Sequence, residues 1–248
     1  AIPSDARTIT DFLLCFDAFD KKALHIRLLP QVSAVLTALR LSGSGRYEFR
    51  SLAEGSYMTT PEGVIVHSMT LEAGSVGMYQ SFPLNEPQRE RVAKDIALIL
   101  KASELERIVR LYTHSLDRAT DNYRSFIAAW SALEILVGKI FPIYQKLLAA
   151  ELRKANQAPG LHAYFDRVDA VMEDKHNLAG KFLVISIFLD DEGLNAEGKD
   201  KEMKTFLRLK KVRDRLFHGE EISEESLPTG EVQQLFDKCL RNHVRRDA

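Results

Sequence analysis

The stretch KKVRDRLFHG, residues 210–219, closes a helical pattern. Apolar residues recur before and within it at steps of three and four, which is the period of one helix face. They are Met203, Phe206, Leu209, Val212 and Leu216. Glycine is the usual residue for a left-handed helix cap, so Gly219 places His218 in the last turn. We therefore predict a helix over residues 201–217 that carries an arginine and a histidine near its exposed end.

The chemistry of this helix end depends on three side chains. Arg213 and His218 are five positions apart, and Asp214 follows the arginine directly. An imidazole beside guanidinium groups can bind a phosphate and move a proton. Positions five apart are separated by about 140° on a straight helix, so the two side chains converge only if the arginine reaches across or a second subunit contributes. Asp214 and His218 are one turn apart, and the spacing predicts a direct contact that orients the imidazole.

Length and composition are those of an ordinary soluble globular protein. Of the 248 residues, 45% are hydrophobic and 28% are charged. The formal net charge of −1 excludes wholesale attraction to nucleic acid, so any such site must be a local patch. Two cysteines, Cys15 and Cys239, make no disulfide framework, which favours a reducing, cytoplasmic setting. No apolar run approaches the ~18 residues of a spanning helix, so we expect no membrane segment.

The chain divides into two parts with different residue patterns. The pattern of residues 1–85 predicts a small mixed α/β region with a few antiparallel strands. Over Gly63–Thr70, for example, successive residues alternate between two faces as they do in a strand. Residues 9–19 indicate a short helix there, residues 46–51 another strand, and residues 31–41 are ambiguous between helix and strand. Residues 86–248 predict a helical domain, so the fold class is mainly α.

Local signals place several helix ends in the second part. Asn85 starts a helix with Pro87 in its first turn, and Ser103 with Glu106 predicts a capping box for the next. Asp121 opens a third, central helix, whose apolar face is broad and rich in small residues and which Pro142 kinks or ends. We expect later helices over residues 161–172, 181–189, 201–217 and 231–244, with a loop over residues 190–199.

Two features together resemble the HEPN superfamily, and most closely its ApeA-like branch. One is Arg213-x4-His218 at the end of a late helix, followed by Gly219 and a last helix. The other is YRSFIAAWSALEIL, residues 123–136. The resemblance covers residues 87–244. A second pair with similar spacing, Arg107 and His114, lies in an early helix without the glycine, and we regard it as accidental.

The resemblance implies an up-and-down helical bundle that forms a homodimer. Many family members are metal-independent endoribonucleases of toxin–antitoxin systems, phage defence or RNA surveillance; others are catalytically inactive modules that bind RNA, a nucleotide or a protein. The family's active residues map onto Arg213 and His218, with Asp214 between them and Glu134 as a supporting acid. We expect RNA cleavage by 2′-hydroxyl attack, and the alternative is an inactive homodimeric binding module. A protein partner for the N-terminal region is a further expectation.

Simpler interpretations stay open beside this one. His218 can bond the last carbonyls of its helix while Arg213 is merely solvated. The cations of the helix form either an RNA-binding track or an ordinary charged face; they are Lys201, Lys204, Arg208, Lys210, Lys211 and Arg215. The seven histidines show no metal-ligand spacing, so we expect no metal and no other cofactor.

Overall fold

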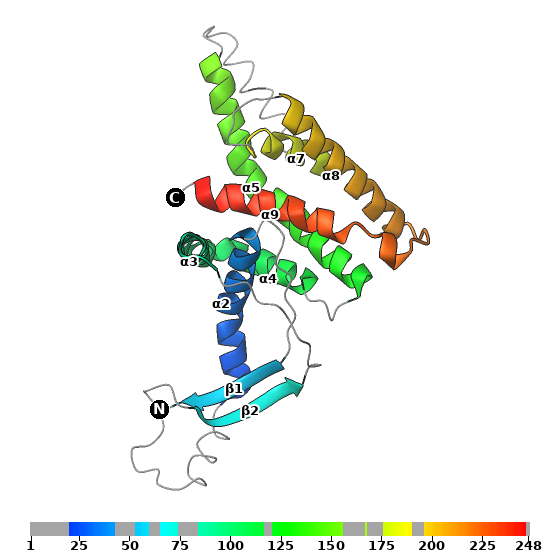
Figure 1. The fold of residues 1–248 in the computed structure, drawn as a ribbon. Helices are drawn as coiled ribbons and strands as arrows, with labels where there is room; N and C mark the ends of the chain where they lie inside the picture. Colours follow the sequence, from blue (N-terminus) through cyan, green and yellow to red (C-terminus); the bar gives the residue numbers. More distant parts are fainter. Residues whose placement is uncertain are drawn as a thin grey trace. The chain divides into compact units, whose positions relative to one another are not determined.

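The prediction of a mainly helical chain is confirmed (Figure 1). The computed structural model describes residues 20–42, 53–59, 65–73, 84–116, 121–155, 167, 176–189 and 196–246. The chain forms two compact units. One contains residues 1–33 and 51–82, and the other contains residues 34–50 and 83–248.

The first unit contains a β-hairpin. Strand β1 (Ala53–Thr59) pairs antiparallel with β2 (Ile65–Ala73), which covers most of the strand predicted over Gly63–Thr70. The predicted helix over residues 9–19 and strand over residues 46–51 lie outside the described residues.

Helix α2 (Lys21–Ser42) resolves the ambiguity over residues 31–41 in favour of a helix that runs through Pro30. The side chain of Asp20 accepts a hydrogen bond of 2.8 Å from the backbone of Ala23, which caps the first turn. The last part of α2 belongs to the second unit, where Ala38 and Leu41 are buried in the core. The sequence did not indicate this placement.

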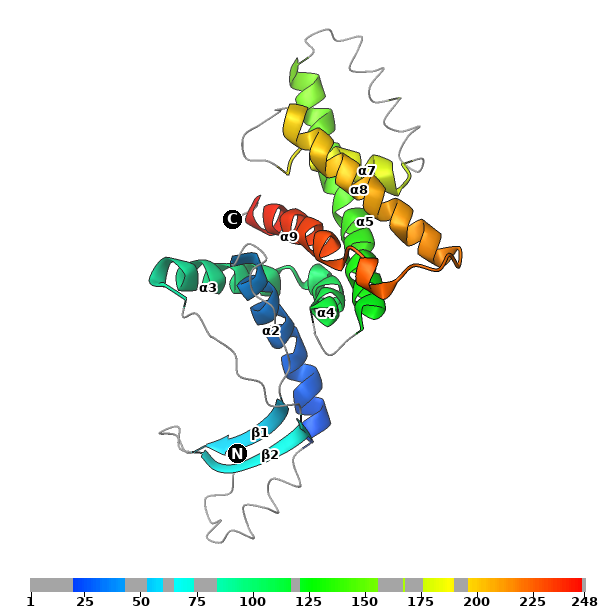
Figure 2. The same cartoon turned by 45° about the vertical axis from the view of Figure 1, so that its right-hand side comes forward.

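The second unit is a bundle around one long helix, α5 (Figures 1 and 2). Its helices are α3 (Glu86–Lys101), α4 (Glu106–Ser115), α5 (Asn122–Ala155), α7 (Leu178–Ser186), α8 (Ala196–Phe217) and α9 (Thr229–Arg246). Helices α4, α7 and α9 pack on α5, while α8 packs on α7 and α3 packs on α9. Short 3₁₀ turns, Ser103–Leu105 and Glu224–Ser226, precede α4 and α9.

Two of the predicted helix starts are confirmed, and one predicted capping box is wrong. Asn85 caps α3 in a reciprocal capping box with Gln88, and Pro87 lies in the first turn as expected. Asp121 accepts a 2.7 Å bond from the backbone of Arg124 and so opens α5. The capping box predicted at Ser103 is wrong, because that residue starts the 3₁₀ turn and α4 has no side-chain cap.

Two helices are longer than predicted. Helix α5 runs through Pro142 to Ala155, so the proline does not end it. Helix α8 begins at Ala196, inside the predicted loop over residues 190–199. The helix predicted over residues 161–172 lies almost wholly outside the described part of the chain.

The buried face of α5 is broad and rich in small residues, as predicted. Its fully buried residues include Phe126, Ala129, Trp130, Ala132, Leu133, Leu136 and Val137. Aromatic rings join it to its neighbours: Phe182 of α7 stacks on Phe206 of α8 with centroids 4.1 Å apart, and Trp130 lies 5.6 Å from Phe206. This cluster fixes α8 and therefore the position of its end.

Helix α5 also corrects one expectation about membranes. By length and composition alone, residues 122–154 are apolar enough to cross a membrane, although we expected no such stretch from the sequence. Half of the most apolar window is buried inside the fold. A core helix has this composition because it packs on several sides.

Candidate site at the end of helix α8

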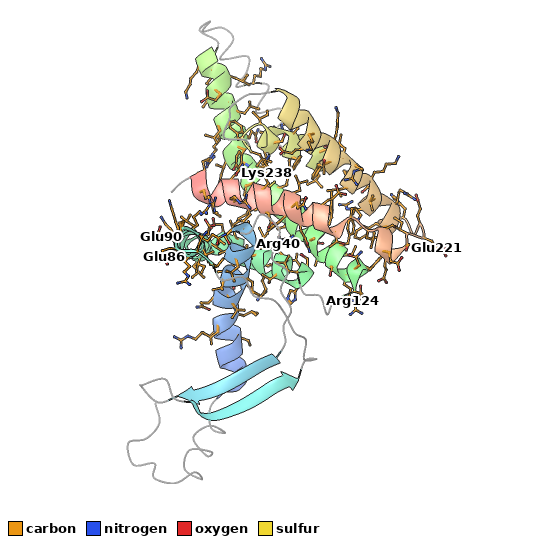
Figure 3. The ribbon with its side chains drawn as sticks, viewed as in Figure 1. Arg40, Glu86, Glu90, Arg124, Glu221 and Lys238 are labelled. Carbon is orange, nitrogen blue, oxygen red and sulfur yellow. The ribbon has the colours of Figure 1, made fainter. Side chains whose placement is uncertain are left out.

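Helix α8 ends in the glycine cap that the sequence predicts. Gly219 has a φ of 79°, in the left-handed region. Its N–H donates to the carbonyl of Leu216 at 3.1 Å, and the N–H of Glu220 donates to the carbonyl of Arg215 at 3.1 Å. This pair of bonds is a Schellman motif, which places His218 at the helix terminus as expected. The acidic turn that follows α8 contains Glu221, labelled in Figure 3.

The guanidinium of Arg213 is held by two carboxylates. Its Nη2 donates to both oxygens of Glu134 on α5, at 2.9 and 2.7 Å, and its Nη1 donates to Asp214 at 2.8 Å. Glu134 is held in turn by the indole N–H of Trp130, at 3.0 Å. Glu134, which the sequence predicts as a supporting acid, therefore contacts Arg213 directly across two helices.

Two aromatic rings also lie beside this guanidinium. The Cζ atom of Arg213 lies 5.5 Å from the ring centroid of Trp130 and 5.4 Å from that of Phe217. Cation–π attraction of this kind adds to the hydrogen bonds. The side chain of Arg213 is 23% exposed, so it is positioned by its neighbours but still reaches solvent.

Charge and partial burial act in opposite directions on Arg213. Burial lowers the pKa of the guanidinium, but the hydrogen bonds and charges of Glu134 and Asp214 outweigh it, so the pKa is raised overall. The arginine is a permanent cation here. Any anion that binds it must compete with two carboxylates that are already in place.

The contact predicted between Asp214 and His218 is not formed. The carboxylate of Asp214 instead accepts from Lys210 at 2.6 Å and from Arg213 at 2.8 Å. The hydrogen bond from Lys210, the largest cause, lowers the pKa of Asp214, and Arg213 acts in the same direction. The carboxylate is thus taken by two cationic side chains, whose charge-assisted hydrogen bonds leave it no need of the imidazole.

His218 is exposed, and no described residue forms a hydrogen bond with its imidazole. Its backbone N–H closes the last helical bond, to the carbonyl of Asp214 at 2.9 Å. The simpler interpretation, an imidazole bonded to the last carbonyls, is also not observed. Among the described residues, Arg213 and His218 form no hydrogen bond with each other, which agrees with the angle between them around the helix.

Three of the cations predicted as a possible RNA-binding track are paired with carboxylates. Arg208 pairs with Glu231, Lys210 with Asp214, and Arg215 with Glu220 at 2.5 Å. Lys211 is exposed and has no such partner in the part of the chain that the structure describes. These exposed pairs are individually weak, so the cations remain available to a phosphate backbone.

Within the described ranges, no group of three or more potential ligand side chains could hold a metal ion. Residues 1–19, 156–166 and 190–195 are outside those ranges. The titratable groups that gather at the end of α8 are the imidazole of His218, several cations, and the carboxylates of Glu134, Asp214 and Glu220. Such a set suits anion binding and proton transfer.

Neither a family model, nor a curated protein, nor a solved structure matches the chain. The chemistry of the site is therefore inferred from its own geometry. Its two chemical elements are a cation fixed at Arg213 and an accessible imidazole at His218.

A second polar cluster, which the sequence analysis missed, is buried between α2, α4 and α9. Asp237 accepts a hydrogen bond from Tyr112 and pairs with Arg40 at 3.3 Å. Arg40, labelled in Figure 3, also donates to Gln233 at 3.4 Å. Burial, the largest cause, raises the pKa of Asp237 to about 6, although Tyr112 and Arg40 oppose it. No local pattern could have revealed this cluster, since 197 positions separate Arg40 from Asp237.

Proposed function

We propose that the protein is a metal-independent endoribonuclease of HEPN type. It works as a cytoplasmic homodimer, in phage defence or a toxin–antitoxin role, with a small mixed α/β N-terminal region that meets a protein partner. The observation that carries the proposal is the end of α8, where two carboxylates fix the guanidinium of Arg213 and leave the imidazole of His218 open to solvent.

Each residue has a defined part in the proposed reaction. His218 removes the proton of a ribose 2′-hydroxyl, and the resulting oxygen attacks the adjacent phosphorus. Arg213 donates hydrogen bonds to the phosphate oxygens as negative charge builds up on them. The bond to the 5′-oxygen breaks, and that oxygen takes a proton from the protonated His218 of the second copy. The products are a 2′,3′-cyclic phosphate and a 5′-hydroxyl.

A second copy is needed for geometric reasons. Within one protomer, Arg213 and His218 project about 140° apart around α8. Two helix ends related by a two-fold axis bring two arginines and two histidines to one cleft. Asp214 and Glu134 then position the arginine, since the imidazole has no carboxylate partner among the described residues.

Displacement of the carboxylates is the main cost of phosphate binding. Ion pairs that reach solvent contribute ~1 kcal/mol or less, so a phosphate with several cationic neighbours can replace one of them. The Nε–H of Arg213 is buried and lacks an acceptor in the described structure. A guanidinium that turns toward a phosphate gains a partner for this donor.

The test is incubation of purified protein with mixed RNAs in EDTA. The wild type is expected to produce 2′,3′-cyclic phosphate ends, and Arg213→Ala and His218→Ala should each lower the rate by about 100-fold or more. The chain provides matched controls in the exposed pair Arg107 and His114, whose alanine variants should cleave at the wild-type rate. Equal cleavage by all variants, or a requirement for a divalent metal, would contradict the proposal.

One observation favours a second candidate, an inactive homodimer that binds RNA, a nucleotide or a protein. Both terminal nitrogens of Arg213 already donate to carboxylates, which suits a structural arginine. Such a protein would bind RNA without producing cyclic phosphate ends. Binding and cleavage measured on the same RNA distinguish the two candidates.

A further inference from the structure

Phe217 is the most exposed large hydrophobic side chain in the described part of the chain, at 64%. It lies immediately before His218 and one turn after Arg213. The apolar face of α8 points elsewhere: Phe206 and Leu209 are fully buried, and Leu216 is 9% exposed. Packing within the protomer therefore does not account for an aromatic ring at this position.

The ring of Phe217 contacts Arg213, the arginine of the candidate site. The guanidinium of Arg213 lies 5.4 Å from the centroid of Phe217, while Trp130 borders the same guanidinium from the core. Trp130 is 1% exposed, so Phe217 is the aromatic ring of this cluster that reaches solvent. A phosphate bound at Arg213 thus brings its own nucleoside close to an exposed aromatic ring.

The surroundings of Phe217 favour a nucleobase over an apolar protein surface. Cationic side chains lie on the same helix end, at Lys211, Arg213 and Arg215. Positive charge attracts a phosphate backbone, and an aromatic ring offers a stacking surface to any base. Proteins that bind single strands combine these two elements, whereas a purely apolar partner would bury the cations at a cost.

We infer that Phe217 is a stacking platform for an unpaired base next to the phosphate bound at Arg213. A base within a duplex is stacked on both sides and cannot reach the ring, whereas a base in a loop or an end can. This inference rests on the proposed function and adds a base-binding residue to it. Phe217 is a positioning residue, not a catalytic one.

The test measures binding separately from cleavage. The ligands are a single-stranded 2′-O-methyl RNA, which lacks the attacking hydroxyl, and the duplex of the same sequence. Wild type, Phe217→Tyr and Phe217→Leu are compared, with Leu207→Ala as the control because Leu207 is another exposed apolar residue of α8, at 45%. Phe217→Leu should weaken single-strand binding by about tenfold, whereas Phe217→Tyr and Leu207→Ala should stay within about twofold of wild type.

The outcomes separate the inference from the function on which it rests. Wild-type binding by Phe217→Leu, together with normal RNA cleavage by the wild type, would overturn the inference and leave the nuclease proposal standing. An equal loss on single strand and duplex would also overturn it, because the ring would then act only by holding Arg213. A change in oligomeric state of Phe217→Leu, measured by sedimentation, would assign the ring to a contact between copies instead. Failure of the wild type to bind or cleave any RNA would remove the proposed function itself.

Discussion

Arg213 shows how one side chain can be both structural and available to a ligand. Its hydrogen bonds to Glu134 and Asp214 hold it between α5 and α8, and the ring of Trp130 supports it from the core. A guanidinium fixed in this way loses little side-chain entropy when an anion arrives. The carboxylates that fix it also oppose an anion, so in the proposed function the affinity for phosphate depends on how firmly Glu134 is held.

Replacement of Glu134 tests the structural part of this arrangement. Glu134→Ala leaves the indole N–H of Trp130 and the guanidinium of Arg213 without their shared acceptor. We expect the free energy of unfolding to fall by about 1–2 kcal/mol, measured by urea denaturation followed by circular dichroism. Glu151, at the other end of α5, pairs with Lys154 on the surface, and Glu151→Ala should change the stability by less than about 0.5 kcal/mol. Equal losses in the two variants would show that the hydrogen bonds of Glu134 to Trp130 and Arg213 add no stability.

At the scale of the element, the end of α8 is determined by one backbone conformation. Gly219 adopts a positive φ, and its Schellman bonds end the helix at Phe217, with His218 as the cap residue. The side chains that such a motif brings together are often apolar. Here Arg215 and Glu220 occupy those positions and form an ion pair. The turn is therefore held by charge, and the imidazole projects from a defined point.

Gly219→Ala isolates the backbone contribution. A Cβ atom at this position would meet nothing within 4 Å, so any cost comes from the left-handed conformation alone. We expect a loss of about 1–2 kcal/mol in the free energy of unfolding. Gly138 also has open space around its Cβ position but lies inside α5, so Gly138→Ala should instead stabilise by up to about 1 kcal/mol. Thermal unfolding of both variants measures whether each change lowers or raises the stability. Two changes in the same direction would contradict this account of Gly219.

These elements show which features local sequence can predict. The glycine cap, the start of α3 at Asn85 and the apolar face of α5 follow from residue types and their spacing, and all three are confirmed. The predicted contact between Asp214 and His218 is wrong because spacing along a helix does not show which of several neighbouring side chains a carboxylate binds. Lys210 lies one turn before Asp214 and competes from the other side. Helix ends that lack a strong sequence signal are predicted less well: the predicted start of α8 lies several residues after the observed one.

At the scale of the whole molecule, the connections that matter most lie far apart in sequence. Arg213 reaches Glu134 across 79 positions, and Arg40 reaches Asp237 across 197. Periodicity contains no information about such pairs, which arise when helices pack. The buried cluster of Arg40, Tyr112 and Asp237 joins α2, α4 and α9 on a different part of the bundle from the site.

Asp237 makes the stability of the bundle depend on pH in a direction opposite to that of a surface carboxylate. Its native pKa of about 6 lies above the ordinary value, so the native state binds more protons than the unfolded state between about pH 4 and pH 6. Its contribution to the free energy of unfolding therefore falls as the pH rises through this window, by up to about 3 kcal/mol, and is constant above it.

The measurement compares wild type with Asp237→Asn, which cannot titrate, by urea denaturation at several pH values. The difference between their free energies of unfolding should shift in favour of the variant between about pH 4 and pH 6. Titration of all other groups cancels in this difference. A shift in the opposite direction would mean that the charge of Arg40 outweighs burial.

The bond between Trp130 and Glu134 gives the molecule an optical property. The chain contains a single tryptophan, and its indole N–H donates to the carboxylate that holds Arg213. A ligand that draws the guanidinium away alters the electric field and the hydrogen bond at this one fluorophore. Light emitted by the unlabelled protein therefore reports the state of the helix end directly.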